Sequence, residues 1–522
     1  MRGRRPLIAA LAMAAAVAAL AAWRAACVLA GPDVDTDAYA HHMIARAILA
    51  DPRDLGVHWV WLPLFHYLQV PLVALGGTMD DVRWINVLLS AAVPVVLFGY
   101  VRRSTPADGA AMSPDATALL AALFAAACPI AMQMGTTAQS EPLFALLALS
   151  IAVAYERRRY VTAALLLGVA VVVRYEAWAI FATAGAIIAV EEVHDQLGRR
   201  RGRTGERPPP RRWLVVVIPL VPILAWAVLR RPVDGRWFGF LGDTHTFASQ
   251  AVVDKAGSRG FVGLVGDALY YPAFVAVRVL GPVAVLAPFG VLRTWRRQGA
   301  RFVLLLAACL AFVSLTWVQR SSLGLDRHFV AVVALYATFA AQGAAVIAER
   351  LAGWIDSLGR SGRPGRLVSD RARAFAARGV AAIVALTSLA GLCVMLDVWM
   401  GFWRGSIERG WPERASLGAY LRTLPNDVPI FCDDATLEIL SGVDRRRFDR
   451  HWVDDPATWT LIGDAARAHG VAYVATWRRK LVGHEAAGDV VFHASDSPDD
   501  PAAPNAGVAV MRVSPDSDRA AR

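Results

Sequence analysis

The sequence predicts an all-α polytopic membrane protein of about eleven transmembrane helices with a small extracytoplasmic α/β domain at its C-terminus. Three observations predict this fold class. Of the 522 residues, 56% are hydrophobic and only 19% are charged, whereas soluble domains are about 45–50% apolar and about 25% charged. Long apolar stretches alternate with short basic clusters. After residue 400 the composition becomes that of a soluble domain.

The composition also excludes several classes of protein. A chain with so few charges and so many apolar side chains has enough apolar surface to fold, so it is not a disordered protein. The net charge of +11 comes from basic residues that lie between apolar runs, which is typical of a polytopic membrane protein and predicts no nucleic-acid partner. The five cysteines form no CxxC pair, so neither a disulfide framework nor a zinc site is predicted.

Eleven apolar stretches are candidates for transmembrane helices, which need about 17–25 residues, although the two beside Arg174 are short. They cover residues 7–30, 84–101, 115–134, 141–155, 160–174, 177–191, 213–230, 271–292, 301–318, 328–348 and 380–400.

A twelfth apolar stretch, residues 62–77, contains two prolines and a histidine and is too short for a full crossing. If it crossed, five later basic clusters would lie outside, against the positive-inside rule. It is therefore predicted as a juxtamembrane or re-entrant helix of a large first outer loop, residues 31–83. The N-terminus is then cytoplasmic and the C-terminal domain extracytoplasmic, in the inner (plasma) membrane. Residues 7–30 are interpreted as a retained anchor, with a cleaved signal peptide as the alternative.

Two domains are expected: a transmembrane domain over residues 1–400 and a soluble α/β domain over residues 401–522. In the second, strands are predicted within 426–434 and 470–477, flanked by helices over 413–424 and 456–469. Roughly the last twenty residues are predicted to fray.

The first outer loop is rich in ionisable groups directly after the first apolar stretch. It begins GPDVDTDAYAHHMIARAIL, in which three aspartates alternate. Ionisable groups at a membrane edge indicate a functional site, because their burial is costly. A helix is expected to begin near Asp37, and its spacing places four side chains on one face: Asp35, Tyr39, His42 and Arg46.

Two other interpretations of these acids remain open. Thr36 or Asp37 caps the helix, and the other carboxylates are merely solvated. Alternatively, Asp37 and His41, four residues apart, hold a divalent metal ion. No further cofactor is predicted.

Two short outer connections carry charged residues. The sequence GTTAQSE places Glu141 before Pro142, at the start of an apolar stretch. Its carboxylate either orients a substrate hydroxyl or simply benefits from the helix dipole. In the next connection, Arg174 and Glu176 are two residues apart, and they either serve a site or neutralise each other.

A group of basic residues lies near predicted outer helix ends: Arg278, Arg320, Arg327 and His328. Arginine binds phosphate through two parallel hydrogen bonds, so such a group suits a lipid phosphate. The alternative is that the individual arginines reach towards the membrane surface without a ligand.

The order of these features resembles the C-type (GT-C) membrane glycosyltransferases, especially the protein O-mannosyltransferase and lipid A aminoarabinose transferase branches (glycosyltransferase family 39-like). After the acidic loop come HWVWLPLFHYL and DDVRWINVLLSAAVPVVLFGYVRR, then SEP, and then VVRYEAW. The resemblance covers about residues 7–190. Beyond them it is architectural, apart from the turn at Arg327.

The resemblance implies roles for individual residues. Asp35 matches the first-loop acid of the family, at the point where the sugar leaves its lipid phosphate, and Tyr39 occupies the following place. Glu141 matches the acid of the second outer loop, and Arg174 stands where relatives carry Lys or Arg. The family often has Asp-Glu at the first acid, whereas here a threonine follows Asp35, so Asp37 is expected to supply the second carboxylate.

The resulting hypothesis is a hexosyl- or pentosyltransferase that moves a sugar from a polyprenyl-phosphate donor to a lipid, glycan or protein acceptor. Asp35 acts as the general base on the acceptor or orients it, Asp37 and Glu141 position acceptor and sugar hydroxyls, and Arg174, Arg278 and Arg327 stabilise the phosphate as it leaves. A Gly-rich phosphate loop is not found in the sequence. The alternatives are a polytopic transporter or lipid flippase and a non-catalytic membrane scaffold.

Overall fold

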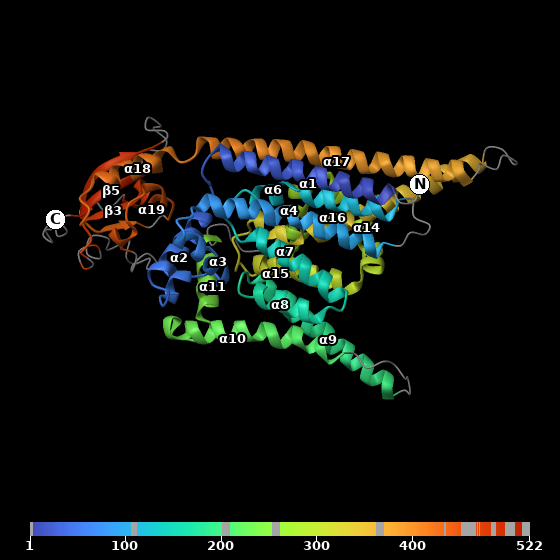
Figure 1. Ribbon diagram of the computed structural model, residues 1–522, viewed down its shortest axis with the longest axis horizontal. Coiled ribbons are helices and arrows are strands. Elements are labelled where there is room, and N and C mark those ends of the chain that lie inside the picture. Colours follow the sequence, from blue (N-terminus) through green and yellow to red (C-terminus); the bar gives the residue numbers. More distant parts are fainter. Residues whose placement is uncertain are drawn as a thin grey trace. The chain divides into compact units, whose positions relative to one another are not determined.

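The structure is a computed structural model, and it consists of two compact units (Figure 1). One unit comprises Met1–Ala30 and Ala45–Arg404, and the other comprises Gly31–Ile44 and Gly405–Arg522. The residues described are 4–105, 112–200, 209–252, 261–361, 370–432, 435–449, 466, 468, 470–481, 487–495 and 507–513.

The first unit is helical. In chain order its helices are α1 (Arg4–Ala30), α2 (Thr36–Ala50, which begins in the second unit), η1 (Leu55–His58), α3 (Leu64–Ala74), α4 (Met79–Ser104), α5 (Pro114–Ala126), α6 (Pro129–Met134), α7 (Glu141–Glu156), α8 (Tyr160–Ala170), α9 (Glu176–Arg200), η2 (Pro210–Trp213), α10 (Leu214–Asp234), α11 (Gly239–Val252), α12 (Phe261–Leu269), the π-helical η4 (Tyr270–Val275), α13 (Ala276–Leu280), α14 (Pro282–Gln298), α15 (Ala300–Val318), η5 (Asp326–Val332), α16 (Val333–Ser361) and α17 (Asp370–Arg409, which ends in the second unit).

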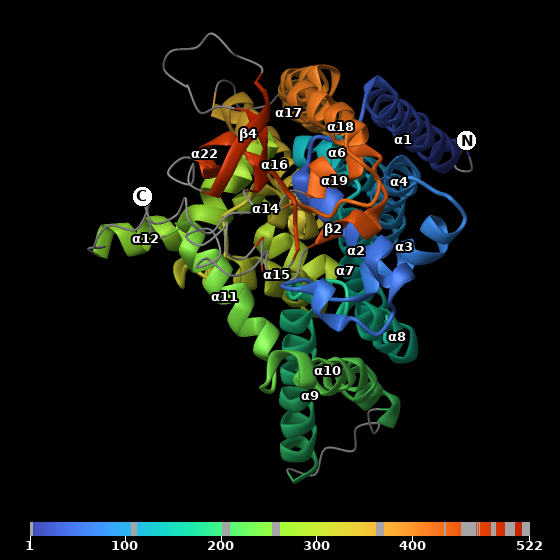
Figure 2. The same ribbon diagram turned by 90° about the vertical axis from the view of Figure 1, so that its left-hand side faces the viewer.

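Among the described residues, eight helices are long and apolar enough to cross a membrane, so the chain is a multi-pass membrane protein. Helices α8, α9 and α10 lie side by side, and α14 packs along α16 (Figure 2). Helix α3 has 11 residues, or about 16 Å at 1.5 Å per residue, and is too short to cross a hydrocarbon core of about 30 Å.

Two predicted spans are wrong as single helices. The stretch 115–134 divides into α5 and α6, because the residue before Pro129 is extended, with φ −63° and ψ 120°. The stretch 271–292 divides at Gly281, whose φ of +53° interrupts the helix before Pro282 begins α14. Apolar length therefore predicts membrane segments but not the breaks within them.

The second unit contains a five-stranded sheet of order β2-β1-β3-β5-β4. Its strands are β1 (Ile430–Cys432), β2 (Phe448–Asp449), β3 (Tyr473–Trp477), β4 (Gly488–Ala494) and β5 (Val508–Val513). Strands β2, β1 and β3 are parallel, and β5 is antiparallel to both β3 and β4. The helices are α18 (Pro412–Thr423), α19 (Ala435–Ser441) and α22 (Arg478–Leu481).

The sheet has an apolar core on each face. Leu417 and Leu421 of α18 pack against one face with Ile430 and Val510, whereas Phe431 and Met511 belong to the other. The two predicted strands and the helix over 413–424 are present, whereas most of 456–469 lies outside the described residues. The prediction of a frayed C-terminus is wrong for β5, because five of its six side chains are buried.

Candidate functional site

The loop at residues 135–140 is held by buried side chains of α4, within the first unit. Arg83 Nε donates to the carbonyl of Thr136 at 2.8 Å. Asn86 Nδ2 donates to the carbonyls of Thr137 and Gln139, each at 2.7 Å. Both Arg83 and Asn86 are fully buried. These bonds from α4 help to fix the path of the loop and therefore the start of α7 at Glu141.

We expect Asn86→Leu to lower the free energy of unfolding by about 2–4 kcal/mol, because it leaves two buried carbonyls without their donor. Thermal unfolding in detergent measures the change. Gln69→Leu is the matched control: Gln69 is 3% exposed, and neither of its amide atoms has a hydrogen-bond partner among the described residues. The control should be neutral or stabilising. Equal losses in the two variants would contradict the assignment.

The turn at residues 171–175 is fixed by the first outer loop and by α9. Trp178 Nε1 donates to the carbonyl of Val171 at 2.8 Å, and the amide of Leu64 donates to the carbonyl of Val172 at 2.9 Å. The hydroxyl of Tyr175 donates to the carbonyl of Val60 at 3.1 Å. These bonds orient Arg174, the polar residue of the turn.

His58 and His66 belong to the first outer loop and are both fully buried. Their Nδ1 atoms are 2.8 Å apart, so one ring donates to the other. Burial, together with the guanidinium of Arg230, lowers the pKa of His58 to about 3. Because His58 is neutral and packs against Trp226, it is a structural residue of the loop.

A buried ion cluster forms where the 135–140 loop meets the 171–175 turn. Arg174 Nη1 lies 2.7 Å from Glu141 Oε1, and its Nη2 lies 2.8 Å from Glu176 Oε1. Arg174 Nη1 also donates to the hydroxyl of Ser140 at 3.2 Å. Arg327 Nε lies 3.5 Å from Glu141 Oε1. Of the residues predicted for the site, the structure thus brings together Glu141, Arg174 and Arg327.

The charges of this ion cluster nearly balance, and its arginines remain accessible. Glu141 and Glu176 are 3% and 5% exposed, whereas the side chains of Arg174 and Arg327 are each 15% exposed. The carboxylates therefore lie behind the guanidinium groups and hold them. Glu141 Oε2 has no hydrogen-bond partner among the described residues. Such an arrangement suits binding of an anion better than removal of a proton by Glu141.

Two residues that the sequence does not mark, Tyr271 and Ser322, contact His328, the neighbour of Arg327. Tyr271 Oη donates to the carbonyl of Leu325 at 3.1 Å and lies 3.4 Å from Nδ1 of His328. Ser322 Oγ is also 3.4 Å from that nitrogen. Tyr271 lies in the π-helical turn η4, a type of turn frequent at functional sites. No periodicity in the sequence marks this turn.

The other basic residues predicted for the phosphate contact carboxylates outside the ion cluster. Arg278 pairs with Asp326 and donates to Tyr270 Oη at 3.2 Å. Arg320 lies 3.3 Å from Asp267 and over the ring of Trp317. Arg278 is thus linked to the ion cluster through Asp326, which precedes Arg327 in the chain.

The first-loop acids lie in the second unit, where they order the start of α2. The amide of Asp35 donates to Asp33 Oδ1 at 3.0 Å, and the amide of Asp37 donates to Asp35 Oδ1 at 3.1 Å. Asp35 is therefore the residue that caps α2, and the prediction of a cap at Thr36 or Asp37 is wrong. Tyr39 and His42 follow on α2 and are both buried. No group of three or more His, Cys, Asp or Glu side chains that could hold a metal ion occurs among the described residues.

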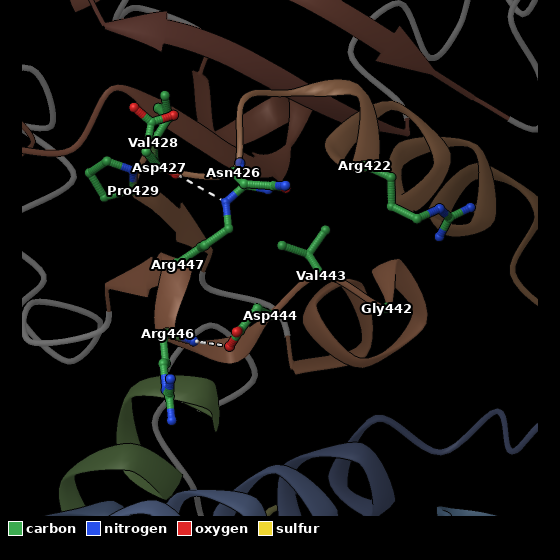
Figure 3. A pocket seen from close by; sticks show the side chains of 10 residues that line it. All are labelled: Arg422, Asn426, Asp427, Val428, Pro429, Gly442, Val443, Asp444, Arg446 and Arg447. Carbon is green, nitrogen blue, oxygen red and sulfur yellow. Dashed lines mark hydrogen bonds between the residues drawn. The ribbon is translucent and has the colours of Figure 1, made fainter.

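A polar hollow of about 540 Å³ lies in the second unit, where strands β1 and β2 begin (Figure 3). Three arginines line it, but Figure 3 shows them pointing in different directions. Arg447 donates to the carbonyls of Val428 and Pro425, and Arg422 donates to the carbonyl of Ser441. Because the guanidinium groups do not converge, they do not form an anion site.

No protein-family model matches the sequence, and no curated protein matches it. The similar solved structures include two that match nearly the whole chain. One is ArnT from Cupriavidus metallidurans bound to undecaprenyl phosphate, with a TM-score of 0.55, 15% identity, and coverage of 96% of this chain and 97% of that one. The other is the same protein in the apo state, with a TM-score of 0.55, 13% identity and the same coverage. The chain therefore shares the fold of ArnT, and the predicted resemblance is confirmed at the level of the fold.

Proposed function

We propose that this protein transfers a sugar from a polyprenyl-phosphate donor to an acceptor at the extracytoplasmic face of the membrane. The observation that carries the proposal is the buried ion cluster of Glu141, Arg174, Glu176 and Arg327, in which two arginines are held by carboxylates and remain accessible. The fold supports it, because the similar ArnT structure contains undecaprenyl phosphate. The sugar is a hexose or a pentose, and the acceptor is a lipid, glycan or protein.

The reaction is a displacement at the anomeric carbon. The acceptor oxygen forms a bond to that carbon, and the bond to the phosphate oxygen breaks, so that polyprenyl phosphate leaves with the electron pair. Arg174 and Arg327 stabilise the charge that develops on the leaving phosphate, and Arg278 supports this contact through Asp326. Glu141 keeps both arginines in place and contributes to positioning the sugar hydroxyls.

The acceptor proton passes to Asp35 in this proposal. Its carboxylate accepts a hydrogen bond from the amide of Asp37, and a carboxylate offers about four acceptor sites in all. Asp37, Tyr39 and His42 are proposed to position the acceptor. This assignment depends on the resemblance of the first outer loop to that of the GT-C glycosyltransferases.

We expect Arg327→Gln to raise the Kd for undecaprenyl phosphate by about 10- to 100-fold, the effect of losing one charge-assisted contact to the phosphate. Binding of labelled undecaprenyl phosphate to the detergent-solubilised protein measures it. Arg320→Gln is the matched control, since Arg320 lies in the loop that precedes η5 but pairs with Asp267. Equal affinities of the Arg327 variant and the unaltered protein would contradict the phosphate site.

The transporter hypothesis predicts a different fate for the labelled donor lipid. Membranes that contain the protein are incubated with a labelled polyprenyl-phosphate sugar and an extract of envelope acceptors. Sugar transfer releases free polyprenyl phosphate and labels an acceptor. A flippase moves the intact lipid across the membrane without breaking the sugar–phosphate bond, and that result would overturn the proposed function.

A further inference from the structure

Within the second unit, Trp411 connects the first-loop acids to the C-terminal sheet. Helix α17 ends at Arg409, and Gly410 follows with φ +60°, a conformation that ends helices. Pro412 then begins α18, and Trp411 between the two helices is not helical, with φ −130° and ψ 67°. The backbone break thus fixes the direction of the Trp411 side chain.

Two donors reach the backbone carbonyl of Asp33. Trp411 Nε1 donates to it at 3.2 Å, across 378 residues of sequence, and Tyr39 Oη donates at 2.9 Å. Asp33 and Tyr39 are each 1% exposed. A Cβ added to Gly31 would lie 2.8 Å from the carbonyl oxygen of Ile407, so the two backbones approach too closely for a larger residue. The acidic loop is therefore fixed against the residues that precede α18.

The hydrogen bonds continue from this carbonyl to Asp35. The side chain of Asp33 accepts from the amide of Asp35, and the side chain of Asp35 accepts from the amide of Asp37. A shift of the Asp33 backbone would therefore move the carboxylate of Asp35.

Trp411 is also connected to the sheet. The guanidinium carbon of Arg414 lies 3.6 Å from the ring centroid of Trp411 and 4.5 Å from that of Trp477. Arg414 is 2% exposed, and a buried cation between two indole rings is strongly held. Trp477 ends β3, where it pairs with Val508 of β5. The sheet, Arg414, Trp411 and Asp33 thus form one continuous set of contacts.

We propose that the C-terminal α/β domain positions the first-loop acids and that Trp411 is the positioning residue. The inference rests on the proposed function, in which Asp35 accepts the acceptor proton. In the proposed reaction, Trp411 contacts no reacting atom. Its indole N–H holds the Asp33 carbonyl, and its stacking on Arg414 holds the indole. Positioning is consequential because a displacement of about 1 Å at a reacting group can cost about 100-fold in rate.

The test is Trp411→Phe in the full chain, which keeps an aromatic ring against Arg414 and removes the N–H. We expect hydrogen–deuterium exchange of residues 31–40 to rise by about 5- to 10-fold, as expected for loss of one hydrogen bond. We expect kcat for sugar transfer to fall by about 10-fold while KM for the donor stays within about twofold. Trp411→Phe combined with Tyr39→Phe should lose more than the product of the single losses, because both donors bind one carbonyl.

Trp399→Phe is the matched control for exchange. Trp399 lies on α17, and its Nε1 donates to Gln133 Oε1 at 2.7 Å, so loss of this hydrogen bond should leave exchange over residues 31–40 unchanged. Unchanged exchange in Trp411→Phe would overturn the positioning role, whatever the activity. Increased exchange with unchanged kcat would support the hydrogen bond from Trp411 to Asp33 but would overturn the role of Trp411 in catalysis. Since exchange needs no substrate, the first result is independent of the proposed function.

Discussion

Arg174→Met is expected to lower the free energy of unfolding by about 3–5 kcal/mol and to abolish measurable binding of undecaprenyl phosphate. Its guanidinium lies between Glu141 and Glu176, at 2.7 and 2.8 Å, and both carboxylates are buried. Removing one partner of a buried ion pair costs about this much, because a charge remains without compensation. Chemical unfolding in detergent and binding of the labelled lipid measure the two effects.

Two further variants separate stability from ligand binding. The triple variant Arg174→Met, Glu141→Gln and Glu176→Gln removes the uncompensated charges, so we expect it to regain most of the stability but no phosphate affinity. Arg212→Met removes another buried arginine, paired with Glu192 and Asp195, and should lower stability while the folded fraction still binds the lipid. If the triple variant bound the phosphate normally, Arg174 would be only a structural residue.

The fold was predictable to the extent that it depends on apolar length. The positive-inside rule predicts that 62–77 does not cross the membrane, and this stays a prediction; the structure shows there the 11-residue helix α3. The breaks at Pro129 and Gly281 were missed because the apolar pattern continues through them, whereas the break depends on backbone angles. Strand β5 was missed because VAVMRV follows a Pro/Asp-rich stretch and its pairing with β3 is non-local.

The candidate site was predictable where charged residues end apolar stretches. Glu141, Arg174 and Arg327 stood out for this reason, and the structure brings them together. The residues that hold the loops of the site in place could not be recognised from the sequence. Asn86 contacts a loop more than 50 residues away, and it resembles any other polar residue of a membrane helix. Trp411 could be counted as an interfacial aromatic, and only the tertiary structure relates it to Asp33.

Asp35→Asn is expected to lower the rate of sugar transfer by about 10²- to 10⁴-fold, the usual contribution of a general base. Stability should stay within about 0.5 kcal/mol, because asparagine and aspartate are about equally good helix caps. The Oδ1 of asparagine can still accept the hydrogen bond from the Asp37 amide. The substitution therefore removes the charge but keeps the local structure, which an alanine would not. Initial rates of transfer to labelled acceptor, with the amount of folded protein determined separately, measure the loss.

Asp33→Asn is the matched control for this experiment. Asp33 Oδ1 accepts from the amide of Asp35 as Asp35 Oδ1 does from that of Asp37, so both variants keep an acceptor and lose one charge within the same loop. If the negative charge of the loop alone promoted transfer, the two variants would lose activity equally. If Asp35 accepts the proton, only its variant loses the chemical step, and KM for the donor is preserved because Arg174 and Arg327 are unchanged. Transfer by Asp35→Asn at more than half the normal rate would exclude Asp35 as the base.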